Sequence, residues 1–104
     1  MLNDPKWDEK VEVELDAISR NLLRAVDYIQ QHGWCQGEAF GPNGTVCMLG
    51  ALDKTRGHAI TYLKAIDRLI PLIGGIPINR WNDAEGRTKD EVITKLREAA
   101  YLGK

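Results

Sequence analysis

A chain of 104 residues is long enough for one hydrophobic core and too short for a second domain of ordinary size. Hydrophobic residues at 43% and charged residues at 28% are typical of a globular protein, which excludes disordered and collagen-like chains. Lysine and arginine number 14 and acidic residues 15, so the net charge of -1 provides no overall field that attracts nucleic acid or anionic lipid.

The first ten residues, MLNDPKWDEK, contain acidic side chains and a proline and are not followed by an apolar run. This is not the pattern of a signal or transit peptide. No segment approaches the roughly 20 apolar residues that cross a bilayer. We therefore expect a cytoplasmic protein that does not enter a membrane. In this compartment two cysteines are more often reduced thiols than a bridge, and a disulfide between Cys35 and Cys47 is the alternative that spacing alone does not decide.

The longest helical pattern ends at Gly33. Apolar residues recur there every three or four positions, at Trp7, Val11, Leu15, Ile18, Leu22, Val26 and Ile29. This spacing places them on one face of a helix that packs on a core. The start is open, because residues 11–15 also alternate with a period of two and are compatible with a short strand before a helix that begins near Asp16.

Residues 33–57 interrupt the helical pattern. The tripeptide Pro-Asn-Gly at 42–44 is a turn signal, and it predicts that residues 40–46 form a short β-hairpin or an irregular turn. Residues 46–52 then have the composition of a buried helix. A glycine in a helix costs about 1 kcal/mol relative to alanine, so Gly50 indicates close approach to another backbone.

Two more helices are predicted. The first covers residues 58–70, stops at Pro71 and has its apolar side chains on one side, at Ala59, Ile60, Leu63, Ile66, Leu69 and Ile70. The second opens at a capping box of Thr88 and Glu91 and buries Val92, Ile93, Leu96 and Ala99 or Ala100. An apolar, glycine-broken segment and a loop over residues 79–83 connect the two helices.

These elements predict a mainly α fold. We expect a single small domain of about four helices, with a short β-hairpin or an irregular turn after the first helix. Residues 15–104 are assigned to this domain. Residues 1–14 are either an N-terminal extension or the start of the first helix.

Both cysteines and both histidines lie in or beside residues 33–57. These residue types, at His32, Cys35, Cys47 and His58, are ligands that zinc prefers. Structural zinc sites usually contain two closely spaced pairs, and only the first pair here is close in sequence. We therefore expect no metal and no cofactor, with the cysteines acting as small buried hydrophobic residues. A zinc-binding protein that uses all four side chains is kept as the alternative.

A cysteine nucleophile is a further alternative. Cys35 or Cys47 as thiolate, with His58 as base and Asn82 or Asp83 as the orienting group, would give the arrangement of cysteine acyl-transfer enzymes. The apolar neighbours of Cys47 would raise its pKa if it is buried, whereas Cys35 stands in a glycine-flanked turn. Because a chain of this length contains many such triples by chance, we assign no catalytic residue.

The candidate binding residues are Trp34 and the run Arg80-Trp81-Asn82-Asp83. A cation, a large aromatic and two polar side chains in one loop are typical of binding surfaces. Arg80 and Trp81 would also suit stacking on a nucleotide base. In the commoner alternative, Trp81 fills the core while Asn82 and Asp83 form an Asx turn, and Trp34 has the same two interpretations.

Three motifs occur in order along the chain. HGWCQG (32–37), VCMLGAL (46–52) and WND (81–83), with a final Leu- and Ala-rich helix, resemble a family of small uncharacterised proteins from actinobacteria and bacteriophages. The resemblance covers roughly residues 20–100. It implies a shared compact fold and no reaction, and it assigns no catalytic residue.

We therefore expect a small non-enzymatic binding or adaptor protein, encoded by a phage or a mobile element. Its surface would be formed by the turn at 34–44 and the loop at 80–83, and its partner would be another protein or a second copy of itself. Nucleic acid and membrane are not expected partners. The alternative is a small cysteine-dependent enzyme or a zinc-binding protein that uses Cys35, Cys47 and His58.

Overall fold

The computed structural model describes residues 16–102 of the chain. Five α-helices and two 3-10 turns make up this part: α2 (Ala17–His32), η1 (Pro42–Gly44), α3 (Met48–Lys54), α4 (Ala59–Leu69), η2 (Ile70–Ile73), α5 (Ile78–Asn82) and α6 (Lys89–Leu102). These residues contain two isolated bridges and no sheet. The prediction of a mainly helical single domain is confirmed. The described residues hold one helix more than the four expected, because the predicted loop at 79–83 lies mostly in α5.

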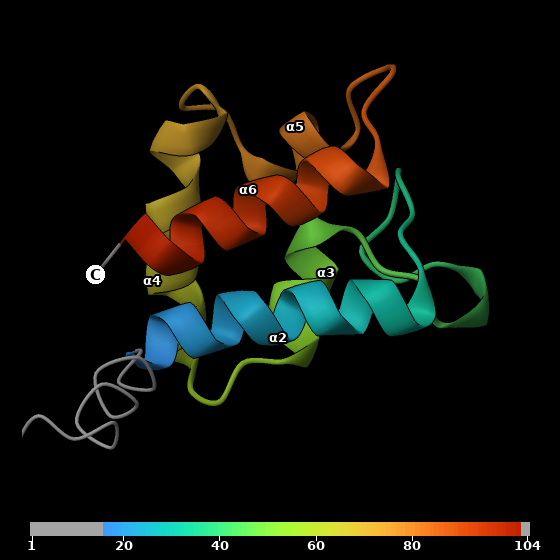
Figure 1. Ribbon diagram of the computed structural model, residues 1–104. Coiled ribbons are helices and arrows are strands. Elements are labelled where there is room, and N and C mark those ends of the chain that lie inside the picture. Colours follow the sequence, from blue (N-terminus) through green and yellow to red (C-terminus); the bar gives the residue numbers. More distant parts are fainter. Residues whose placement is uncertain (1–15, 103–104) are drawn as a thin grey trace, which may run out of the picture.

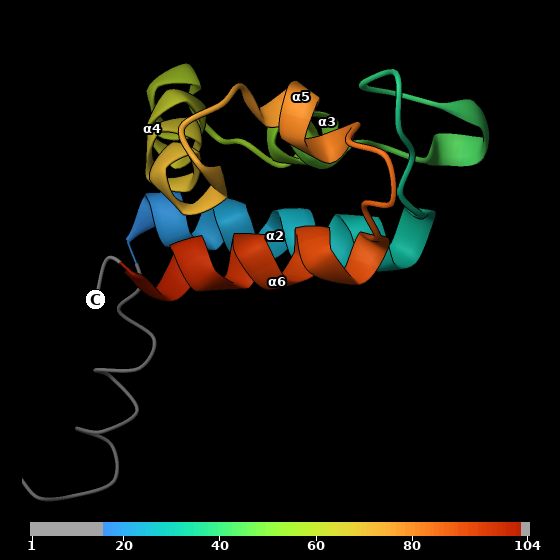
Figure 2. The same ribbon diagram turned by 90° about the horizontal axis from the view of Figure 1, so that it is seen from above.

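The helices are arranged in two layers. Figure 2 shows α2 and α6 side by side and antiparallel in one layer, with α3, α4 and α5 in the other. α4 crosses α2 and α6 at the end of the domain where α6 finishes, and the turn that follows α2 lies at the opposite end (Figure 1). The core lies between the layers, and its largest fully buried apolar side chains are Leu22, Ile29, Met48, Leu52, Leu69 and Leu96.

The first described helix, α2, begins at Ala17 because Asp16 caps it. The backbone N–H of Ser19 donates to Asp16 Oδ1 at 2.7 Å. The predicted core face is confirmed at Leu22, Val26 and Ile29. Whether residues 5–15 are helix or strand, and how residues 1–14 are assigned, are questions that fall outside the described residues.

The predicted β-hairpin at residues 40–46 is wrong, and the alternative of an irregular turn is correct. Residues Pro42–Gly44 form the 3-10 turn η1, with Asn43 in the left-handed region at φ 60°. Val46 makes two isolated bridges and no ladder. Because Cys47 is already the N-cap of α3, the second arm of a hairpin ends after one residue.

The predicted apolar face of α4 is confirmed at Leu69, is partly buried at Ile66 and Ile70, and is wrong at Ile60 and Leu63. Ile60 and Leu63 are 58% and 52% exposed, whereas the buried residues of α4 are Thr61, Ala65 and Leu69. Thr61 and Ala65 have small side chains, and small side chains allow helix axes to approach closely. α4 therefore packs against α2 and α6 through this stripe, and its larger aliphatic side chains at Ile60 and Leu63 face solvent.

The last helix, α6, begins as predicted at the capping box. Thr88 N donates to Glu91 Oε1 at 2.9 Å, and Glu91 N donates to Thr88 Oγ1 at 3.2 Å. The first of these hydrogen bonds is the main cause that lowers the pKa of the Glu91 carboxyl. All the predicted core positions are buried: Val92, Ile93, Leu96, Ala99 and Ala100. No helix of residues 16–102 combines the length and the apolar character that a membrane crossing requires.

The predicted close approach at Gly50 is confirmed. Cys47 N donates to Ala39 O at 3.1 Å, which draws the turn onto the start of α3. A Cβ atom built on Gly50 would overlap the carbonyl oxygen of Ala39. Glycine at this position therefore allows the backbone of the turn to lie directly on α3.

We predict that Gly50→Ala lowers the free energy of unfolding by about 2 kcal/mol or more, because the added methyl group forces the turn away from α3. Helix propensity alone would give the opposite sign, by about 1 kcal/mol. Gly57→Ala is the matched control, since a Cβ there meets nothing within 4 Å. Urea denaturation measures both variants. A stabilising effect of Gly50→Ala would contradict the observed packing.

Arg68 connects three helices at the end of the domain where α6 finishes. Its Nη2 lies 2.9 Å from Asp16 Oδ2, and its Nη1 donates to Ser19 Oγ at 2.9 Å and to Ala99 O at 3.3 Å. Ser19 Oγ in turn donates to Ala100 O at 2.6 Å. The start of α2, the end of α6 and the last turn of α4 are thus joined through one guanidinium group.

We predict that this cluster is sensitive to acid. The Ser19 N–H, and secondarily Arg68, lower the pKa of the Asp16 carboxyl below its usual 3.8. The stabilisation is therefore complete above that value and is lost as the pH falls through the lowered pKa. Asp16→Ala should cost about 1–2 kcal/mol at pH 7, as loss of an N-cap does.

Asp16→Asn is the control for the charge alone. Asparagine keeps the cap, so this variant should lower the free energy of unfolding by less than about 1 kcal/mol at pH 7. Its free energy of unfolding should also decrease less than that of the wild type as the pH falls. Urea denaturation from pH 7 down to acid measures both effects. An equal loss of stability in acid for the wild type and Asp16→Asn would contradict the role of the carboxylate.

Candidate functional site

The buried side chain of Asn82 joins the two segments that were predicted to form one surface. Its Oδ1 accepts hydrogen bonds from Trp34 Nε1 at 2.7 Å and from Met48 N at 3.0 Å. Its Nδ2 donates to Cys35 O at 3.2 Å and to Asp83 Oδ1 at 2.9 Å. These four bonds use the full capacity of the carboxamide, so the side chain is completely satisfied in the interior.

Further hydrogen bonds hold the turn against α5. Gln36 Nε2 donates to the carbonyl oxygens of Asn82 and Ala84, both at 3.0 Å. Gly37 N donates to Asp83 Oδ1 at 2.9 Å. Asp83 therefore satisfies the amide of a distant turn. The segments at 34–44 and 80–83 are adjacent, as the sequence analysis expected, and the contact between them is an internal one.

The five candidate binding residues divide by exposure. Trp34 is half-buried with its indole N–H engaged, Trp81 is 8% exposed and Asn82 is fully buried. Arg80 and Asp83 are exposed. Burial and hydrogen bonding account for Trp34, Trp81 and Asn82 as parts of the fold, and a binding role for any of the five stays a prediction.

The four alternative zinc ligands are not gathered around one point. Within residues 16–102, no three His, Cys, Asp or Glu side chains are placed to share a metal ion. The His32 ring packs on Tyr28 with centroids 4.2 Å apart. His58 is exposed at the N-cap of α4.

The thiols are not arranged as an activated nucleophile. Burial raises the pKa of the Cys47 thiol, which is 3% exposed and accepts a hydrogen bond from Gly50 N at 3.3 Å. Cys35 Sγ lies 3.5 Å from Glu38 O. Along the described chain, neither sulfur is hydrogen-bonded to a histidine or a carboxylate, so the nucleophile and base of the alternative do not meet.

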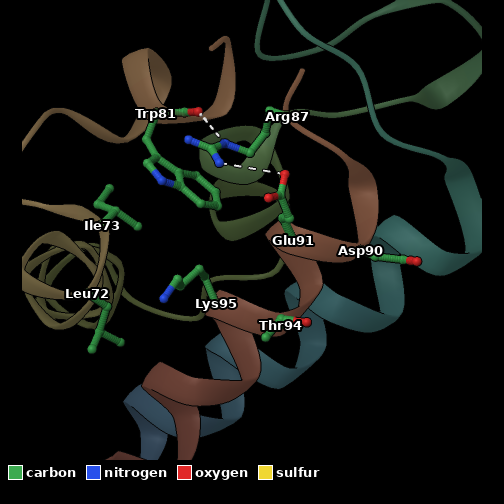
Figure 3. A pocket seen from close by; sticks show the side chains of 8 residues that line it. All are labelled: Leu72, Ile73, Trp81, Arg87, Asp90, Glu91, Thr94 and Lys95. Carbon is green, nitrogen blue, oxygen red and sulfur yellow. Dashed lines mark hydrogen bonds and ion pairs between the residues drawn. The ribbon is translucent and has the colours of Figure 1, made fainter. Parts of the chain in front are cut away.

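A groove of about 450 Å³ lies between the first half of α6 and the segment that runs from η2 to α5. Its floor is apolar, with Leu72, Ile73 and Trp81, and its rim carries the charged side chains Arg87, Asp90, Glu91 and Lys95. Figure 3 shows Arg87, Glu91 and Lys95 facing Trp81, Ile73 and Leu72 across the groove, with Asp90 pointing outward. Trp81 thus borders the groove, while the next residue, Asn82, belongs to the interior.

Arg87 fixes the indole of Trp81 in the groove. Its guanidinium carbon lies 3.7 Å from the ring centroid, and its Nε donates to Trp81 O at 2.9 Å. Arg87 Nη1 also lies 3.6 Å from Glu91 Oε1 (Figure 3). Arg87 was not among the predicted site residues, because its place four residues before Glu91 does not indicate that it stacks on Trp81.

The sequence model of a family of unknown function, DUF6197, matches residues 14–102. The chain belongs to this family. The DUF6197 match includes the Asn82 contacts and the groove, and the expected membership of an uncharacterised family is confirmed. Neither curated proteins nor solved structures include a match to the chain.

We predict that Asn82→Asp destabilises this DUF6197 protein by about 3 kcal/mol or more at pH 7, because the new carboxylate would be buried against Cys35 O and the Asp83 carboxylate. That environment raises the pKa of the introduced group, so stability is lost as the pH rises through it and is partly regained in acid.

Asn79→Asp in the same helix is the matched control, because Asn79 is exposed. Its expected effect is within about 0.5 kcal/mol. Urea denaturation between pH 4 and 8 measures both variants. Equal, small effects of the two substitutions would show that the hydrogen bonds of Asn82 do not hold the structure.

Proposed function

We propose that this protein is a non-enzymatic binding module that accommodates an apolar side chain of a partner protein in the groove over Trp81. The observation that carries the proposal is the groove itself. Its volume of about 450 Å³ lies within the range of roughly 300–1,000 Å³ that is usual for binding pockets.

The floor of the groove suits an apolar anchor. Leu72, Ile73 and Trp81 come from two short elements, η2 and α5, and border the groove opposite α6. Stacking by Arg87 holds Trp81 in one orientation, so little side-chain entropy is lost when a partner binds. Tryptophan and arginine are also the residues that most often dominate binding energy at protein interfaces.

The charges of the rim favour a protein over an anion. Arg87 pairs with Glu91, and Lys95 lies 3.1 Å from Glu98, so the two cations of the groove are each accompanied by a carboxylate. Asp90 adds a negative charge. A phosphate or a nucleic acid would meet no net positive field here. A peptide with an apolar anchor and mixed polar flanks would match both the apolar floor and the mixed charges of the rim.

This proposal keeps the predicted adaptor role but places the binding surface at the groove instead of the turn at 34–44. Trp81 is still proposed to contact the partner, together with Arg87. Trp34 and Asn82 are assigned a structural role, because their side chains hydrogen-bond to each other. Origin in a phage or mobile element and a cytoplasmic location remain predictions from sequence. A second copy of the chain is the other partner that was expected. The exposed apolar side chains Ile60 and Leu63 of α4 lie outside the groove, so they are not part of the proposed binding surface.

The proposal is tested with a displayed library of random peptides selected on the full chain. We expect enriched peptides that share an apolar anchor. Leu72→Glu should weaken their binding about tenfold or more, since a charge then faces the anchor. Leu63→Glu is the matched control, because this leucine is 52% exposed outside the groove.

Circular dichroism and thermal melting verify that both variants are folded. If Leu72→Glu unfolds the protein, Lys95→Trp provides the second variant, because a bulky side chain from α6 would occupy the groove. Absence of any enriched peptide, or equal binding to wild type and the groove variants, would refute the proposed function.

A further inference from the structure

Cys35 and Cys47 occupy neighbouring positions on two paired chain segments. Val46 N donates to Gly33 O at 3.1 Å, and Cys35 N donates to Val46 O at 2.9 Å. These two bonds define a parallel bridge between Trp34 and Val46. Cys35 and Cys47 are the residues that directly follow this bridge on its two segments.

The bridge places Cys35 and Cys47 one residue beyond a pair whose backbone separation suits a disulfide. In-register residues of paired segments lie about 4.8 Å apart and project to the same side. Disulfides join residues whose Cα atoms lie about 4.4–6.8 Å apart. Cys47 retains an extended backbone, at φ -86° and ψ 179°. The bridge is isolated, because the Asn82 carboxamide bonds Met48 N and Cys35 O, the two groups that the next hydrogen bond of the register would join.

The surroundings of the two sulfur atoms are also shared. Cys35 Sγ lies against Glu38 O and beside Gly41, where a Cβ atom would come within 2.9 Å of it. Cys47 lines a cavity of about 250 Å³ together with Glu38 and Ala39. Cys35 is also one of the groups that raise the pKa of Cys47, after burial. Both thiols thus lie under the same turn.

We infer that Cys35 and Cys47 form a reversible intrachain disulfide that cross-links the turn to the start of α3. The oxidant is a low-molecular-weight disulfide such as glutathione disulfide. The more exposed Cys35 loses its proton and attacks one sulfur of that disulfide, forming a mixed disulfide and releasing one thiolate. Cys47 then loses its proton and attacks Cys35 Sγ, releasing the second thiolate. Two S–H bonds become one S–S bond, and two electrons reduce the external disulfide to two thiols.

The cross-link would span the contacts of Asn82. Cys35 O accepts from Asn82 Nδ2, and Met48, the residue after Cys47, donates its N–H to Asn82 Oδ1. A covalent bond between the two cysteines would hold both of these partners in place. The inference rests on the cysteines and their register, and it does not depend on the proposed binding function.

The test uses the full chain, folded and reduced, in glutathione buffers of increasing oxidised fraction. We expect an intact monomer that is lighter by two hydrogen atoms, resists thiol alkylation and returns to the dithiol with reductant. The oxidised protein should melt about 5–15 °C higher than the reduced protein. Cys35→Ser and Cys47→Ser are the controls, and serine at 47 keeps a side-chain acceptor at the N-cap.

Each single variant should form a mixed disulfide with glutathione at most, with no comparable rise in melting temperature. Wild-type protein that stays reduced, that yields only mixed disulfides or dimers, or that forms the disulfide only in denaturant would overturn the inference. An oxidised monomer that melts below the reduced protein would overturn the cross-link between turn and helix.

Discussion

Four hydrogen bonds to the carboxamide of Asn82 determine where α5 lies, and the groove depends on that position. The partners of Asn82 come from the turn after α2, from the first residue of α3 and from Asp83. A buried amide that lost any of them would leave an unsatisfied polar group, at a cost of roughly 1–3 kcal/mol. The turn after α2, the start of α3 and α5 therefore have one favourable arrangement around Asn82. In that arrangement Trp81, the neighbour of Asn82 in α5, lies at the floor of the groove.

Close backbone contact also stabilises the packing of the turn on α3. Gly50 admits the carbonyl of Ala39 against α3, and the thiol of Cys47 caps that helix through Gly50 N. The motif around the second cysteine thus has a packing explanation, as the sequence analysis expected. At the opposite end of the domain, Arg68 joins α2, α4 and α6 by hydrogen bonds to carbonyl and hydroxyl groups and by its ion pair with Asp16. The two ends of the α2 and α6 layer are held by polar contacts, and its middle by apolar ones.

Sequence signals within a few residues of one another were enough to predict helices α2 and α6. The apolar period of α2, its end before Gly33 and the Thr88 and Glu91 capping box of α6 depend on residues three or four positions apart. α5 has only five residues, which is too short for a periodic pattern to stand out, although Ile78, Trp81 and Asn82 follow helical spacing. α4 has aliphatic side chains on more than one face, so its pattern identified Leu69 but missed the small buried residues Thr61 and Ala65. The hairpin prediction was wrong because the N-cap of α3 leaves no second arm.

The sequence by itself determined the helical class, the capping box of α6, the need for glycine at Gly50 and the two segments that meet near Trp81. Only the tertiary structure decided that Asn82 is interior, that Arg87 stacks on Trp81 and that each cysteine follows one residue of the bridge between Trp34 and Val46. The physical reason is distance along the chain. Trp34 and Asn82 are 48 positions apart, and the pattern of neighbouring residues does not indicate which distant group will hydrogen-bond to the Asn82 side chain. Periodicity and caps report contacts within a helix, whereas the site arises from contacts between helices.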